Sequence, residues 1–193
     1  MADEFETLLE SVRPKAPKRS KGFGAKEIDD LLNGEHGGKV RKFFEAVKWA
    51  EGGQPDLIVG GQKRFDTKGD HPNIVGITTP EGPSTAAGDF QITGSNWYGT
   101  KGRPGLKHRL GAKTFGPEDQ LRGALLLFAD RDGGRGIKAL QNDDYDTALE
   151  IARKDWAALP GSTLHKGRYK GRSRDDFMLR ARGTTSGGEF EKL

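Results

Sequence analysis

A single carboxylate, Glu51, ends a run of apolar residues at helical spacing in the segment KWAEGG. It continues the stripe that Val40, Phe44 and Val47 form on one face of a helix. Partial desolvation and the partial negative charge of a helix C-terminus both raise a carboxyl pKa. A carboxyl group in that state can donate a proton near neutral pH. If the helix frays after Ala50, Glu51 is simply solvated, and spacing alone favours this second interpretation.

The segment STAAGDFQ, residues 84–91, provides a second candidate part of a site, and its residue types would suit a sugar as the ligand. Small residues let the backbone approach a sugar closely, and hydroxyl, aromatic and amide side chains can contact its polar and apolar parts. The alternative is a tight loop before the next helix, with Phe90 in the core. The candidate sugar contacts here are Ser84, Thr85, Gly88, Phe90 and Gln91.

A hydrolase of the two-carboxylate kind needs a second acid across the cleft from Glu51. The candidates are Asp56, Asp66, Asp70 and Asp89. For each of them a strand-capping, turn or other structural role is the favoured interpretation, and Asp66 and Asp70 are also candidate residues of the cleft lip. His71 is expected to be a hydrogen-bonded turn histidine. No histidines pair at metal-ligand spacing and cysteine is absent, so we expect no metal and no cofactor.

The elements that must position these groups follow from hydrophobic periodicity. Apolar residues at helical spacing and terminal signals predict four helical segments, within 25–34, 39–51, 116–134 and 142–161. The short β-branched runs DLIVGG at 56–61 and NIVGITT at 73–79 predict strands of a small sheet. The order of helix, small sheet and several helices predicts an α+β domain with segregated elements.

Composition and charge divide the 193 residues into three regions. Residues 39–163 carry 18 basic and 16 acidic side chains and are close to neutral, whereas dense basic clusters lie outside them, at 13–26 and 166–182. We therefore predict a basic N-terminal extension (1–38), a catalytic domain (39–163) and a basic, Gly-rich C-terminal tail (164–193). Basic ends suit DNA, a cell-wall polymer or an acidic protein surface, and equally a solubilising role. No apolar run approaches 18 residues, so we expect no membrane insertion.

The ordered series WAEGG, DLIVGG, GDHP, STAAGDFQIT, FGPEDQ and DWAALPG resembles the lambda-type endolysins, a lysozyme-fold family of peptidoglycan lytic transglycosylases. The resemblance covers about residues 39–163, and six motifs in the same order make it specific. It implies a mostly helical lysozyme-like fold with a small β-sheet and a cleft between the sheet region and the helical lobe. Two features depart from the family. Only four residues separate Glu51 from Asp56, which is a shorter connection than in the family. Asp89 replaces a basic residue of the family, and it is either a solvated loop residue or a carboxylate that shifts the reaction towards hydrolysis.

By this resemblance, Glu51 is the single catalytic acid/base that cleaves the bond between N-acetylmuramic acid and N-acetylglucosamine and leaves 1,6-anhydromuramyl ends. The alternatives are a two-carboxylate muramidase, or a virion-associated anchoring protein whose basic ends contact virion proteins or DNA. The N-terminus lacks the order of a secretory signal. We therefore expect synthesis in the host cytoplasm and action on the cell wall in the periplasm, either after release at lysis or after delivery in the virion.

Overall fold

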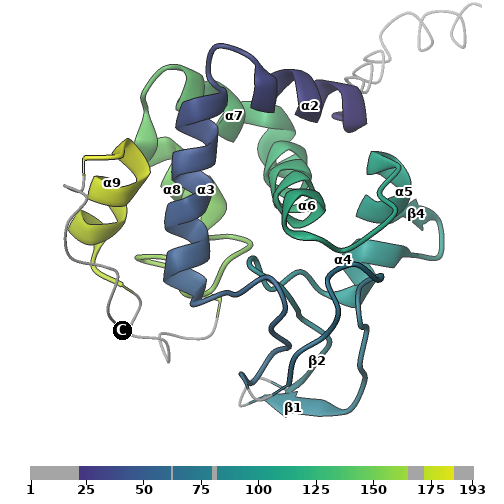
Figure 1. The fold of residues 1–193 in the computed structure, drawn as a ribbon. Coiled ribbons are helices and arrows are strands. Elements are labelled where there is room, and N and C mark those ends of the chain that lie inside the picture. Colours follow the sequence, from purple (N-terminus) through teal and green to yellow (C-terminus); the bar gives the residue numbers. More distant parts are fainter. Residues whose placement is uncertain (1–21, 62, 80–81, 165–171, 185–193) are drawn as a thin grey trace, which may run out of the picture.

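The computed structural model describes residues 22–61, 63–79, 82–164 and 172–184. Most of the ordered elements are helices, and two small antiparallel hairpins lie at one end of the helical part (Figure 1). The helices are α2 (Ala25–Asn33), α3 (Gly37–Glu51), α4 (Gly94–Tyr98), α5 (Leu106–Leu110), α6 (Pro117–Asp130), α7 (Arg135–Gln141), α8 (Tyr145–Ala152) and α9 (Arg174–Arg182), with a short 3-10 turn, η1 (Arg131–Gly134), between α6 and α7. The strands are β1 (Ile77–Thr79), β2 (Gly82–Ser84), β3 (Gly99–Thr100) and β4 (Arg103–Pro104).

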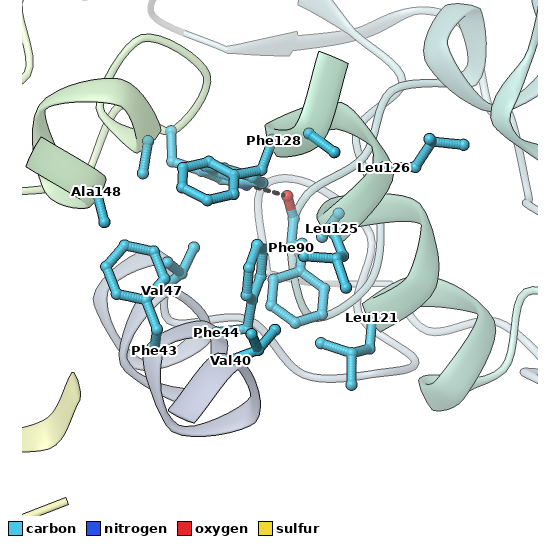
Figure 2. Packing of buried hydrophobic residues seen from close by; sticks show 14 of the residues in the cluster. Val40, Phe43, Phe44, Val47, Phe90, Leu121, Leu125, Leu126, Phe128 and Ala148 are labelled. Carbon is cyan, nitrogen blue, oxygen red and sulfur yellow. Dashed lines mark hydrogen bonds between the residues drawn. The ribbon is translucent and has the colours of Figure 1, made fainter. Parts of the chain in front are cut away.

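Helix α3 is the centre of the hydrophobic core, and its predicted apolar stripe is confirmed. Val40, Phe43, Phe44 and Val47 are fully buried, and side chains of α6 and α8 surround them (Figure 2). Phe44 makes edge-to-face contacts with Phe90, Phe128 and Trp156, at centroid distances of 5.9, 5.7 and 5.9 Å. Such aromatic pairs contribute about 0.5–1.5 kcal/mol each beyond the area they bury. The helix that carries Glu51 is therefore fixed by its own apolar face.

The predicted strand at 56–61 is wrong. Only isolated bridges form there, from Leu57 to Arg64 and from Ile58 to Ala87. The reason is that Gly60 and Gly61 both adopt positive φ and turn the chain before a ladder can extend. The predicted strand at 73–79 is confirmed only as β1, which pairs with β2 in the register Ile77 to Ser84.

The predicted helix within 142–161 is confirmed only as α8, which ends at Ala152. Beyond it the chain turns, and Trp156 and Leu159 are buried from a loop instead of from a helix. The indole Nε1 of Trp156 donates a hydrogen bond to the Phe90 carbonyl oxygen at 3.1 Å, which holds this loop against the segment that follows β2. Tertiary packing thus overrides the helical spacing of the apolar residues here.

Helices outside the predicted catalytic domain share its core. Ile28 and Leu32 of α2 are buried in it, and so is Phe177 of α9, whose ring meets that of Phe43 edge to face at 5.5 Å. Helix α9 packs along α3 (Figure 1). The boundaries 1–38, 39–163 and 164–193 stay predictions of the sequence. Residues 1–21 of the predicted N-terminal extension, and 165–171 and 185–193 of the predicted tail, lie outside the described residues.

Within the described part of the chain, no helix has the length and apolar character needed to cross a lipid bilayer.

Truncation of Phe177 should reveal how firmly α9 belongs to the folded domain. Phe177→Ala deletes a fully buried ring and is expected to lower the free energy of unfolding by about 3–5 kcal/mol. The matched control is Leu179→Ala on the exposed face of α9, which should change it by less than about 0.5 kcal/mol. Urea unfolding followed by circular dichroism measures both. Equal effects of the two substitutions would show that α9 does not contribute to the cooperative core.

Candidate active site

Glu51 is the last residue of α3, so the helix does not fray after Ala50. Gly52 follows in the left-handed conformation (φ 65°), and its N–H donates to the Trp49 carbonyl oxygen at 3.2 Å. This cap turns the chain away sharply and leaves the Glu51 side chain partly buried. Its Oε1 accepts a hydrogen bond of 2.9 Å from the backbone N–H of Ala158.

Burial raises the pKa of Glu51 from an ordinary 4.5 to about 7, although the hydrogen bond from Ala158 acts in the opposite direction. Desolvation penalises the ionised form, whereas the N–H donor stabilises it. At neutral pH both the acid and its conjugate base are therefore populated. A carboxyl group balanced in this way can both donate and accept a proton in one catalytic cycle.

Glu51 borders a cavity of about 570 Å³, which is large enough for sugar units. Its walls come from the end of α3, the turn at 57–61, the β1–β2 hairpin, the segment around 86–93, and the loop at 155–158. Segments distant in the sequence thus enclose one opening between the hairpin region and the helices. The predicted residues in its lining are Glu51, Ser84, Phe90 and Gln91.

Three predicted sugar contacts do not line this cavity. Asp66 is exposed and closes a turn by accepting the Lys68 N–H at 2.9 Å. The Thr85 hydroxyl accepts the backbone N–H of Gly94 at 2.9 Å. Gly88 adopts a positive φ of 80°, and a Cβ there would meet the Gln120 side chain at 2.3 Å. The contacts of these three residues are with neighbouring parts of the protein.

Phe90 and Gln91 each combine a structural contact with a position in the cavity wall. Phe90 is 3% exposed and packs on Phe44, so the core interpretation and the cleft interpretation both apply to it. Gln91 has a positive φ of 49°, which is uncommon for a residue other than glycine, and its Nε2 donates to the Gly88 carbonyl oxygen at 2.9 Å. Backbone strain of this kind is maintained only where the surroundings enforce it.

The predicted second acids lie outside the cavity. Asp56 pairs with Arg64, and Asp70 accepts from the Trp97 Nε1 at 2.8 Å. Asp89 is neither solvated nor in the cleft. It is buried, its carboxylate lies 3.3 Å from the Lys48 Nζ, and no described residue offers its Oδ1 a hydrogen bond.

The second carboxylate that does line the cavity is Asp155, which we did not predict. Arg131 binds both of its oxygens, with the Nε donating to Oδ2 at 3.0 Å and the second amino group donating to Oδ1. A signal was available in the sequence, because Asp155 begins the DWAALPG motif. Its ion-pair partner is distant in the sequence and carried no such signal.

His71 is a buried turn histidine, as predicted. Its Nδ1 accepts the Asn73 N–H at 2.9 Å, and its Nε2 lies 2.8 Å from the Ile92 carbonyl oxygen, which requires a proton on Nε2. Burial lowers the pKa of His71 and favours this neutral form. Among the described residues, no three histidine, aspartate or glutamate side chains gather as metal ligands.

Comparison with known proteins connects this geometry to a family. The family model described as endolysin matches residues 41–188. The endolysin of Escherichia phage lambda is 27% identical over 140 residues, which cover 67% of this chain and 82% of that protein.

Two solved structures share the fold. The bacteriophage lambda lysozyme complexed with a chitohexasaccharide superposes with a TM-score of 0.62 at 24% identity and covers 75% of this chain and 92% of its own. A second structure of lysozyme from bacteriophage lambda gives 0.58 at 22% identity, over 77% and 94% of the two chains. The predicted lysozyme-like α+β fold is therefore confirmed. Since the family model spans most of its length, the chain belongs to the endolysin family, whose members are peptidoglycan-degrading phage enzymes.

Proposed function

We propose that the protein is a lytic transglycosylase that cleaves the β-1,4 bond between N-acetylmuramic acid and N-acetylglucosamine, with Glu51 as its single acid/base. The observation that carries the proposal is a carboxyl group with a pKa of about 7 in the wall of a sugar-sized cavity. A lone group of this kind can perform both proton transfers of an intramolecular transglycosylation.

In the first step, protonated Glu51 donates its proton to the glycosidic oxygen, and the bond from muramic C1 to that oxygen breaks. In the second step, the Glu51 carboxylate takes the proton of the muramic C6 hydroxyl while O6 bonds to C1. Glu51 regains in the second step the proton that it donated in the first, and no water is consumed, so no second carboxylate is needed. The Ala158 N–H at 2.9 Å holds Oε1 in the cavity wall and stabilises the carboxylate between the two steps.

The lining supports a glycan as the ligand. Phe90 is an apolar part of the cavity wall, although only 3% of it is exposed, and Ser84 and Gln91 add polar groups to the cavity that Glu51 lines. A chitohexasaccharide is an oligomer of N-acetylglucosamine, and the solved lysozyme of the same fold carries one, which supports glycan binding. Asp66, Thr85 and Gly88 do not line the cavity, so we assign them no direct contact with the sugar.

A two-carboxylate muramidase is the second candidate, because Asp155 lines the same cavity as Glu51. The bonds from Arg131 to both Asp155 oxygens argue against it, since a nucleophile or base needs an accessible oxygen. Residues 1–38 and 164–193 keep their proposed role as basic ends for virion proteins or DNA. Nothing in the enzyme site depends on that role.

Replacement of Glu51 should abolish catalysis without loss of the fold. Glu51→Gln keeps an acceptor for the Ala158 N–H but cannot donate the proton, so release of muropeptides from sacculi should fall roughly 100- to 10,000-fold. Glu150→Gln, an exposed site on α8, is the matched control and should retain wild-type activity. Turnover of Glu51→Gln at the wild-type rate would refute the mechanism.

The products distinguish the two candidates. Mass spectrometry of digested sacculi should show 1,6-anhydromuramyl ends and not reducing ends. Asp155→Asn keeps an acceptor for Arg131, and we expect it to lose less than about ten-fold in rate and to leave the anhydro products unchanged. Reducing ends from the wild type, together with a much larger loss in Asp155→Asn, would establish the hydrolase.

The raised pKa of Glu51 should make the free energy of unfolding depend on pH. A shift from 4.5 to about 7 corresponds to roughly 3 kcal/mol. The folded state favours the protonated form of Glu51. This contribution to stability is therefore fully present below pH 4.5 and is lost as the pH rises through about 7. The free energy of unfolding of the wild type, relative to Glu51→Gln, should therefore fall by this amount between pH 4 and 8. Urea unfolding across this range tests it, and a constant difference would mean an ordinary, solvated Glu51.

A further inference from the structure

A second cavity of about 610 Å³ lies beside the C-terminal end of α3. Its lining includes Lys48 and Trp49 of α3, Gly52 after it, and Arg172 and Arg180 from the α9 region. Gly52 also lines the cavity that contains Glu51. The two cavities therefore adjoin each other at the residue that caps α3.

Two guanidinium groups are held over one indole ring in this second cavity. The Arg180 guanidinium carbon lies 4.2 Å from the centroid of the Trp49 ring, and that of Arg172 lies 4.9 Å from it. Cation–π stacking orders these long side chains and keeps their planar N–H forks oriented. Planar forks of this kind match carboxylate oxygens in two-point contacts. The indole thus presents a preorganised pair of anion-binding groups.

The charge balance of the cavity also favours an anion. Among the described residues that line it, three are cationic, Lys48, Arg172 and Arg180, and one is a carboxylate, Glu45. The buried Asp89 behind the wall engages Lys48 at 3.3 Å. A ligand here is expected to carry negative charge and to reach the cavity past Gly52.

We propose that this second cavity binds the carboxylates of the peptide stems of peptidoglycan, an inference that rests on the proposed function. The glycan backbone of the polymer is uncharged, and its anionic groups are carried by peptides that branch from the muramic acid residues. A strand bound at Glu51 places a branch next to the bond that is cleaved. The adjoining basic cavity is in the position that such a branch would reach, so it selects strands that carry peptides.

The test compares two substrates prepared from the same sacculi, glycan strands with their peptides and strands stripped by an amidase. The variant is the double substitution Arg172→Gln, Arg180→Gln. It should raise KM roughly ten-fold on peptide-bearing strands, leave kcat unchanged, and have no effect on stripped strands. The control is Arg174→Gln, Arg182→Gln, which removes the same charge from α9 outside the cavity and should match the wild type on both substrates.

A binding measurement separates this inference from the chemistry. Isothermal titration of a soluble disaccharide tetrapeptide into Glu51→Gln should show binding that weakens with salt, and the added arginine substitutions should weaken it by the same factor as KM. Identical kinetics of the double variant and its control on peptide-bearing strands would overturn the inference and leave the proposed function intact. Failure of the wild type to cleave either substrate would overturn the proposed function itself.

Discussion

The desolvation of one carboxyl group at the end of α3 is the constraint on which the site depends. Burial makes the free energy of the ionised form of Glu51 less favourable. Among the described residues, one backbone donor, the N–H of Ala158, offsets part of this desolvation penalty. Too much burial would keep Glu51 protonated, and too many donors would keep it ionised. One hydrogen bond at a partly buried position leaves the pKa near the pH at which a shuttle works best.

The cavity walls are attached to the helix that carries the acid. Phe44, two turns before Glu51, packs on Phe90 from one wall and on Trp156 from another, and the Trp156 indole donates to the Phe90 backbone. Three segments far apart in sequence thus meet at one aromatic ring below the cavity floor. The distance between the Glu51 carboxyl group and the facing cavity walls is therefore set by core packing, which is stiff on the scale that proton transfer requires.

Sequence reasoning identified the parts of this site that follow from local periodicity. The buried face of α3 could be predicted because a helix converts spacing into direction, whereas spacing alone favoured a frayed end and a solvated Glu51. The strand at 56–61 could not be excluded, because two positive-φ glycines decide it, nor could the early end of α8. Asp155 begins the DWAALPG motif, but its pairing with Arg131 depends on a contact between separate segments, which no local pattern encodes.

The donor that holds Glu51 belongs to the main chain, and this affects how the site can change during evolution. Any residue except proline at position 158 supplies the same N–H, so side-chain replacement there does not by itself remove the contact. The pKa of Glu51 is consequently changed by mutations that alter the backbone path of the loop around residue 158, and not by the identity of the amino acid at that position. Relatives that diverge widely in this loop can keep the same acidity, provided that their backbones return to the same place.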